Sequence, residues 1–264
     1  MSMAPLYIDG VSILGPGLAN WEEAARILCG EQPIELAPIV VAAPALLPPT
    51  ERRRAGMAIK LSMAVGLAAA DAAGIDPASL ANVFSSTGGD CENCHNILET
   101  LASSDRMISP TRFHNSVHNA AAGYWSIATH CTAASTSLAA YDATFGAGLL
   151  EAATQALASG KPCLLIAFDT AYPEPLYALR PIPYPFGIGM VLNPARSAAS
   201  LASLRLALTR DPVEPMDDAQ LEHIRQQIPA ARGLPLLRAL ATGTAGRVVL
   251  DYLDDTRLAL EVGA

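Results

Sequence analysis

Positive charge is scarce in this sequence. It contains 17 lysines and arginines against 25 aspartates and glutamates, which gives a formal net charge of -8 at pH 7. A general nucleic-acid binder needs a basic face, and docking on anionic lipid needs a basic patch. The charge balance disfavours both classes, so we expect neither a nucleic acid nor a membrane as a partner.

Long apolar runs and an export signal are also missing. Proline, glycine and charged residues interrupt every apolar stretch before it reaches the roughly 20 residues of a membrane span. The opening residues, MSMAPLYIDGVSILGPG, lack the basic segment and long apolar run of a signal peptide. We therefore expect a cytoplasmic protein whose five cysteines stay reduced.

One cysteine motif nevertheless raises the question of a cofactor. The run STGGDCENCHNILE places Cys91, Cys94 and His95 in the spacing of a c-type haem attachment site. Haem attachment requires export, and a zinc site would need a second Cys/His pair of matching spacing, which the sequence lacks. A redox dithiol at a helix N-terminus, with Asp90 as the N-cap, is the other alternative. We favour ordinary reduced thiols and expect neither a metal nor another cofactor.

Predicted strands and helices alternate along the chain. Its 264 residues, 51% of them hydrophobic, suffice for one large domain with a real core. Strands are expected at 5–13, 80–86, 134–141, 161–169, 186–194 and 202–210, with two more near the C-terminus. Helices are expected at 20–30, 50–74, 90–103, 113–131 and 143–160, and near 217–229 and 233–242. This alternation predicts an α/β fold with a layered sheet.

Three segments, taken in order, carry a resemblance to a known family. They are NWEEAARILCGEQPI, LSMAVGLAAADAAGIDPASLANVFSSTGGD and ISPTRFHNSVHNAAAGYWSIA. They resemble the first helix, the long helix with its glycine-ended strand, and the segment before a buried helix of the β-ketoacyl synthases. The resemblance runs from about residue 5 to 195 and implies the N-terminal half only of a thiolase-like layered fold, in which helices pack on a mixed sheet. We expect residues 1–264 to form a single domain, with about 196–264 as a non-matching extension.

The resemblance implies a nucleophile between a strand and a buried helix. In that family the strand delivers a cysteine to a helix N-terminus, which stabilises the thiolate that takes the acyl group. Counting along STSLAAY and ATFGAGLLEA places Asp142 at this position. A carboxylate is a weak acyl acceptor, so we interpret Asp142 as the N-cap of the helix. Cys131 is expected at the end of the preceding helix, before the strand begins.

The histidines of the condensing reaction are missing as well. In the family they come from a second thiolase half, for which this chain is too short, and His223 lies in an ordinary amphipathic helix. We therefore expect no catalytic residue, with Asp142 marking a degenerate nucleophile position. The resemblance implies a chain-length-factor-like partner that supports fatty-acid or polyketide chain elongation, as in aryl-polyene and xanthomonadin-type pathways. The alternative is a stand-alone acyltransferase, hydrolase or 3-oxoacyl synthase-like enzyme that uses Asp142 or Cys131.

Four residues are candidates for lining an acyl pocket or tunnel. Phe145, Gly146 and Gly148 follow the turn, and His118 is expected on a packed helix of the resembling region. Glycines that only allow the helix to pack closely are an equally good explanation.

The strand before the turn is expected to form a dimer interface. In the resembling family this strand pairs across a two-fold axis, here with a full ketosynthase as a heterodimer or with a second copy as a homodimer. The interface residues are Ser135, Thr136, Ser137, Leu138, Ala139, Ala140 and Tyr141. An acyl carrier protein, which is acidic, is a further possible partner. Its candidate contacts are Arg52, Arg53 and Arg54, which otherwise form a solvated helix start.

Overall fold

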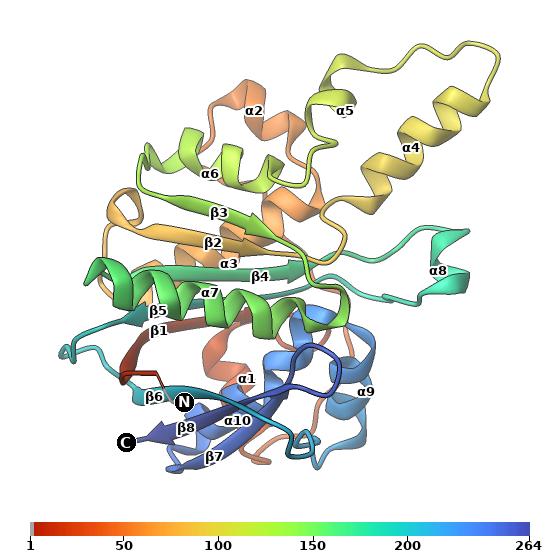
Figure 1. Ribbon diagram of the computed structural model, residues 1–264. Helices are drawn as coiled ribbons and strands as arrows, with labels where there is room; N and C mark the ends of the chain where they lie inside the picture. The colour runs from red at the N-terminus through yellow and green to blue at the C-terminus, as the bar shows by residue number, and fades with distance from the viewer. Residues whose placement is uncertain (1–2) are drawn as a thin grey trace.

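The computed structural model describes residues 3–264. A mixed sheet of eight strands forms its centre, in the order β3-β2-β4-β5-β1-β6-β8-β7 (Figure 1). Strands β3, β2 and β4 are parallel, whereas β5 runs antiparallel to both β4 and β1. The strands are β1 (Leu6–Leu14), β2 (Ala81–Ser85), β3 (Ser135–Leu138), β4 (Cys163–Asp169), β5 (Phe186–Asn193), β6 (Ala202–Thr209), β7 (Gly246–Asp251) and β8 (Arg257–Gly263).

Helices cover both faces of this sheet. Helices α3 and α6 share one hydrophobic core with the sheet, and α1, α7, α9 and α10 share the other. Alternate residues of the fully buried β4 enter the two cores, with Leu164 on the first side and Leu165 on the second. The α-helices are α1 (Trp21–Leu28), α2 (Pro49–Arg54), α3 (Met57–Ala72), α4 (Cys91–Ala102), α5 (Pro110–His114), α6 (Ala120–Thr129), α7 (Thr144–Ser159), α8 (Leu176–Leu179), α9 (Ala219–Gln227) and α10 (Leu234–Thr242).

Helix starts follow local capping chemistry. The Asn20 side chain accepts from the backbone N–H of Glu23 at 2.9 Å and begins α1. The Asp90 side chain accepts from the N–H of Asn93 at 3.0 Å and begins α4, as predicted. Each side chain satisfies a backbone donor that has no partner within its own helix.

Two long predicted helices are each interrupted. The segment 50–74 divides at Gly56, where an added Cβ would lie 2.7 Å from Asp90 Oδ2, so the backbone passes close to this carboxylate. The segment 113–131 divides around Asn115, whose side chain donates to the Arg54 carbonyl and accepts from the Tyr124 hydroxyl. Both predictions of continuous helices were wrong, because contacts distant in sequence fix the breaks.

The sheet ends in different ways at its two edges. Strand β3 lies at one edge and ends at Leu138, so Ala139, Ala140 and Tyr141 of the predicted strand belong to the following turn. At the other side, β6, β8 and β7 extend the sheet beyond β1. Helix α4, its connection to α5, and α8 project from the body at the end of the sheet (Figure 1). Within residues 3–264, no helix is both long and apolar enough to cross a membrane.

Candidate functional site at the turn after β3

A strained turn connects β3 to α7. Tyr141 adopts a left-handed backbone conformation with φ of 52° and opens a short 3-10 helix, Tyr141–Ala143, directly before α7. The Thr144 hydroxyl holds this turn by donating to the Tyr141 carbonyl at 2.6 Å and accepting from the Ala140 N–H at 3.1 Å. A strained residue at a strand-to-helix turn presents its side chain outward. Here that residue is Tyr141, one position before Asp142, and it is 66% exposed.

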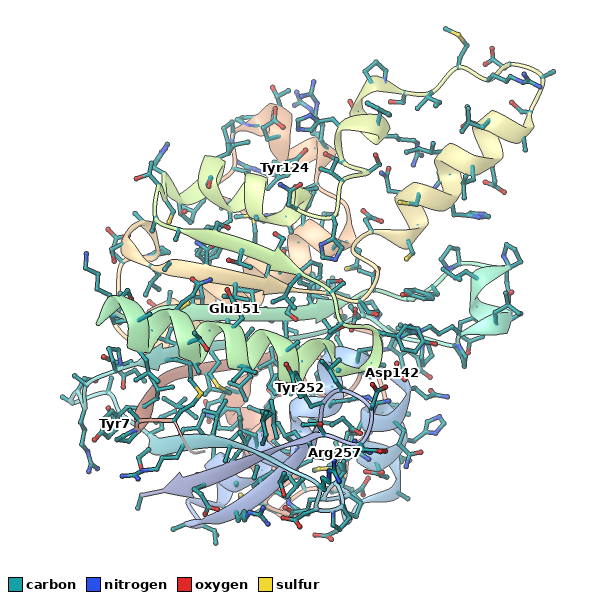
Figure 2. The ribbon with its side chains drawn as sticks, in the orientation of Figure 1. Tyr7, Tyr124, Asp142, Glu151, Tyr252 and Arg257 are labelled. Carbon is teal, nitrogen blue, oxygen red and sulfur yellow. The ribbon has the colours of Figure 1, made fainter. Side chains whose placement is uncertain are left out.

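The Asp142 carboxylate does not cap α7. The N-cap of this helix is Ala143, which makes no side-chain cap bond, so the predicted capping role of Asp142 was wrong. Asp142 Oδ1 instead accepts from Arg180 Nη2 at 2.6 Å, and Oδ2 lies 3.4 Å from Arg232 Nη2. Figure 2 places Asp142 on the side of the molecule from which α4 and α8 project. Because both oxygens face guanidinium groups, the carboxylate is held as an ion-pair partner.

Arg180 joins three parts of this site. It follows α8, donates to Asp142, and also donates to the Thr87 hydroxyl at 3.3 Å. Its guanidinium carbon lies 3.5 Å from the centre of the Tyr141 ring. A guanidinium stacked on an aromatic face is a favourable cation–π contact. Arg180 therefore fixes the ring and the carboxylate of adjacent residues.

A chain of alternating charges leads from Asp142 into the C-terminal segment. Arg232, which also approaches Asp142, lies 3.0 Å from Asp251 at the end of β7. Asp251 accepts from Arg225 at 2.8 Å, and Arg225 in turn donates to Glu222 at 2.7 Å. Arg225 lowers the pKa of Glu222 to about 2. These contacts connect the turn to elements that lie far along the chain.

A buried carboxylate supports the same region from inside. Asp169, at the end of β4, is fully buried and accepts from the N–H groups of Thr87 and Ala230 at 2.8 Å each. The Ser86 hydroxyl donates to it at 3.3 Å. Burial raises the pKa of Asp169 to about 7, although the backbone donors and Arg180 oppose this shift. Asp169 thus ties the end of β2 to the 3-10 helix that carries Arg232.

The residues predicted to line an acyl pocket do not gather around one space. His118 is exposed in the turn between α5 and α6, not on a packed helix as predicted, and its Nε2 donates to the Ser86 carbonyl at 2.8 Å. It borders a surface pocket of about 540 Å³. Phe145 is fully buried against Gly233, where an added Cβ would lie 2.4 Å from the ring.

The two glycines of the turn region allow close packing of α7. An added Cβ on Gly146 would lie 2.6 Å from the Asp251 carbonyl oxygen, and one on Gly148 would lie 2.6 Å from Ser85 Cβ. Such distances leave no room for a side chain. This geometry favours the packing explanation for both glycines.

The two thiols of the CxxC motif have raised pKa values, so the thiolate form is disfavoured. Burial raises the pKa of Cys91 to about 11 and also raises the pKa of Cys94. A redox-active thiol at a helix N-terminus would instead show a lowered pKa. Among residues 3–264, no group of three or more His, Cys, Asp or Glu side chains is arranged to hold a metal ion.

Cys131, the alternative nucleophile, is also buried. It follows α6, is 4% exposed, and its thiol donates to the Leu80 carbonyl at 3.3 Å. A buried thiol in contact with a backbone carbonyl is a poor candidate for accepting an acyl group.

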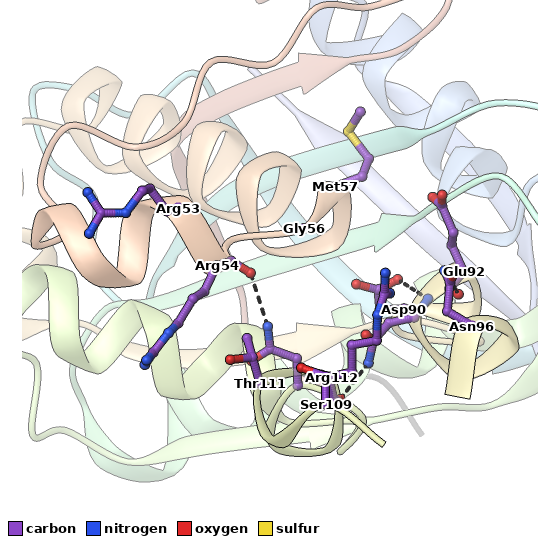
Figure 3. Close-up of a pocket in the computed structure, with 12 residues that line it drawn as sticks. Arg53, Arg54, Gly56, Met57, Asp90, Glu92, Asn96, Ser109, Thr111 and Arg112 are labelled. Carbon is purple, nitrogen blue, oxygen red and sulfur yellow. Dashed lines mark hydrogen bonds between the residues drawn. The ribbon is translucent and has the colours of Figure 1, made fainter. Parts of the chain in front are cut away.

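The three consecutive arginines have different surroundings. Arg52 donates to the carbonyls of Ala45 and Leu47, and Arg54 pairs with Glu51 at 3.1 Å. Arg53 is exposed, and within the described part of the chain it makes no ion pair. It borders a pocket of about 480 Å³ at the base of the α4–α5 projection, in which Arg112 extends toward Asp90 (Figure 3).

Sequence reasoning located the turn but missed the groups that occupy it. Arg180 lies 38 residues after Asp142, and Arg232 and Asp251 lie still further along. None of them belongs to a recognisable motif, and no local periodicity signals such pairing. The positive φ of Tyr141 likewise has no sequence signal, because the residue is neither glycine nor asparagine.

A comparison with protein families identifies the family that this chain matches. The family model described as "Beta-ketoacyl synthase, N-terminal domain" matches residues 19–249, which include most of the segment after residue 195. No curated protein sequence matches the chain.

Solved structures of ketosynthase complexes share the fold. The chain is similar to "Ketosynthase (ApeO) in Complex with its Chain Length Factor (ApeC)" from Xenorhabdus doucetiae, with a TM-score of 0.74, 23% identity, and coverage of 98% of this chain and 100% of that chain. It is also similar to "The ishigamide ketosynthase/chain length factor", with a TM-score of 0.66, 16% identity, and coverage of 98% and 99%. A third likeness, at a TM-score of 0.77 and 12% identity over 99% and 100%, is to a type II PKS acyl-carrier protein in complex with its ketosynthase. These likenesses confirm the predicted thiolase-like layered α/β fold.

Proposed function

The chain belongs to the β-ketoacyl synthase family, and from this premise we propose that it is a non-catalytic, chain-length-factor-like subunit. In this role it pairs with a full ketosynthase and supports fatty-acid or polyketide-type chain elongation, as in aryl-polyene pathways. We propose further that residues 1–264 act as one domain. The continuation of the sheet through β6, β8 and β7 supports this proposal.

The ion pairs of Asp142, in the turn after β3, are the observation that carries the proposal. The predicted nucleophile position holds a carboxylate whose two oxygens face Arg180 and Arg232. To attack a thioester, Asp142 would have to leave both ion pairs and would form a labile mixed anhydride. Tyr141, the neighbouring residue at the strained position, carries a phenol, which is a weak nucleophile without an adjacent base.

The edge position of β3 supports a partner at this side of the sheet. Among residues 3–264, β3 pairs only with β2, in parallel, so its outer backbone groups have no strand partner there. An exposed edge strand is a template for pairing with another chain. The partner that we propose is a full ketosynthase, and a second copy of this chain could occupy the same edge in its absence.

An acylation experiment tests the non-catalytic role. The purified chain is incubated with an acyl-carrier-protein thioester and malonyl-carrier protein, and intact mass and product formation are followed. We expect no acyl adduct and no condensation, and we expect Asp142→Cys to leave condensation absent because residues 1–264 show no counterpart of the two histidines of the condensing enzymes. A stable adduct on the wild-type chain, or condensation by this chain alone, would refute the proposal.

Arg53 is the proposed contact for an acidic acyl carrier protein. Of the three consecutive arginines, it alone has a guanidinium free of the contacts that engage Arg52 and Arg54 among the described residues. We expect Arg53→Glu to weaken chemical crosslinking between the assembled complex and its carrier protein. Arg26→Glu, on the exposed side of α1, is the matched control. Equal crosslinking by both variants would remove Arg53 from the proposal.

A further inference from the structure

Tyr141 combines two costs that a surface side chain would normally avoid. Its backbone has a positive φ of 52°, although it is not a glycine, and its large ring is 66% exposed. A non-glycine residue in the left-handed region is strained and is retained where its surroundings over-determine it. Such an outlier indicates a local function that favours this side chain at this place.

The surroundings hold the Tyr141 ring from one face only. Arg180 lies 3.5 Å from the ring centre, and its position is fixed by bonds to Asp142 at 2.6 Å and to Thr87 at 3.3 Å. The Thr144 hydroxyl fixes the backbone beneath the ring through the Tyr141 carbonyl. The ring is therefore pre-organised before any partner arrives, which reduces the entropy lost on binding.

Tyr141 also lies beside the unpaired sheet edge. It follows the last residue of β3, Leu138, by three positions. If a partner strand pairs antiparallel with β3, the segment after Leu138 continues along the segment that precedes the partner's strand. Tyr141 is then directed toward the partner chain and continues the interface that begins at β3.

Exposed apolar side chains gather in the segments around this turn. Helix α4 and the following residues to α6, together with α8 and its flanks, project at the end of the sheet near the turn (Figure 1). Large apolar side chains that are exposed in neighbouring segments are typical of interaction sites. The exposed large apolar residues of these segments are Leu98, Leu101, Met107, Phe113, Val117, Leu176, Tyr177, Leu179 and Tyr184.

We infer that the stacked pair of Tyr141 and Arg180 is a preformed anchor for the ketosynthase partner, with Asp142 as the residue that positions Arg180. This inference rests on the proposed function and gives the degenerate turn a positive role in assembly. A rigid aromatic ring supported by an arginine has the composition of interface hot spots. The residue at the former nucleophile position thus acts through the ion pair that also excludes it from acyl chemistry.

The Tyr141→Asn variant separates an anchor from a residue that only supports the fold. Asparagine tolerates positive φ, so this variant should unfold at an equal or higher urea concentration than the wild type. The same variant should bind a full ketosynthase from the same organism at least about tenfold more weakly. Tyr141→Phe keeps the ring and should bind within about threefold of the wild type. Affinities are measured by surface plasmon resonance, in which the purified ketosynthase is titrated over each immobilised variant of this chain.

A double-mutant cycle tests the role of Arg180. Arg180→Ala should weaken binding by a similar factor, and the Tyr141→Asn, Arg180→Ala double variant should lose less than the product of the two factors. Leu208→Ala and Arg247→Ala, exposed on β6 and β7 toward the other edge of the sheet, are the matched controls and should bind like the wild type.

Failure of the anchor differs measurably from failure of the proposed function. If the wild-type chain binds the ketosynthase and Tyr141→Asn binds equally well, the anchor is refuted and the partner role stands. If Tyr141→Asn loses stability and affinity in parallel, the ring supports the fold and the anchor is again refuted. If the wild-type chain does not bind the ketosynthase, both the partner role and the anchor are refuted.

Discussion

Asp142 and Cys91 show how the environment of a residue decides its chemistry. Each sits where a sequence pattern suggests reactivity, one at a strand-to-helix turn and one in a CxxC motif. Two guanidinium groups engage the carboxylate of Asp142. Burial disfavours the thiolate of Cys91, whose Sγ donates to the Gly88 carbonyl at 3.4 Å. In both cases the surroundings in the folded chain remove the reactivity that the sequence pattern alone suggests.

Cys91 should react slowly with alkylating reagents. With a pKa of about 11, only about one thiol in a thousand is ionised at pH 8, and the thiolate is the reactive form. We expect iodoacetamide at pH 8 to modify the exposed Cys29 first and Cys91 much later. Peptide mass spectrometry over time measures both rates in one sample, and Cys29→Ser is the control for signal assignment. Modification of Cys91 as fast as Cys29, a haem absorption band, or one equivalent of zinc would restore the redox or metal interpretation of this motif.

Single residues also show where prediction from the sequence succeeds. Asp90 was correctly predicted to cap α4, because capping depends on residues within one helical turn. Arg180 was not predicted to bind Asp142, because this contact depends on how the loop after β4 folds back over the turn. The candidate site was thus proposed from the resemblance to the β-ketoacyl synthases, whereas the contacts within it required the tertiary structure.

At the scale of elements, the prediction was limited by helix breaks and strand length. The alternation of strands and helices predicted the layered α/β fold correctly, because the buried strands are short apolar runs and the helices are longer segments with their own caps. The break at Gly56 was missed, since the alanine-rich sequence around it favours continuous helix and the close approach of Asp90 is nonlocal. Strand β3 proved shorter than predicted, and the difference placed Tyr141 in the turn.

A charge on β3 should prevent pairing at the sheet edge. Its four residues, Ser135–Leu138, carry no charge, and an inward or outward lysine on an edge strand is a known obstacle to strand pairing. We expect Ser137→Lys to abolish the complex with the ketosynthase, since obligate interfaces of this type bury on the order of 2,000 Å² or more. Size-exclusion chromatography with light scattering gives the mass of each species.

Thr244→Lys is the matched control for the edge-strand variant. Thr244 is exposed beside β7, at the opposite edge of the sheet, so this variant should assemble like the wild type. One result would contradict the expected pairing at β3. A wild-type chain that stays a monodisperse monomer beside the ketosynthase, with β3 amides exchanging freely, would show that this edge does not pair.

At the scale of the whole molecule, ionisable groups link the C-terminal segment to the middle of the chain. Asp169 binds the N–H of Ala230, and Arg232 bridges Asp142 and Asp251, so the C-terminal segment is attached to the turn after β3. The segment that extends the sheet also helps to hold the candidate site. The stability of the molecule should therefore respond to the protonation of these groups.

Asp169 and Glu222 should give opposite dependences of stability on pH. Burial raises the folded-state pKa of Asp169 from 3.8 to about 7, so the folded state binds more protons than the unfolded state between these values. The free energy of unfolding should therefore fall as pH rises from about 4 to about 7. For Glu222 the folded-state pKa is lowered from 4.5 to about 2, so its stabilisation is lost as pH falls through this lower range.

The variant Asp169→Asn isolates the first dependence. Asparagine does not ionise, so the unfolding free energy of the wild type minus that of the variant should decrease by a few kcal/mol between pH 4.5 and 7.5 and then stay constant. Urea unfolding at each pH, followed by circular dichroism, measures this difference. Glu222→Gln is the control, because it should alter the pH dependence only below about pH 4.5. A constant difference from pH 4.5 to 7.5 would mean that Asp169 stays ionised throughout, with its three hydrogen-bond donors and Arg180 outweighing the cost of burial.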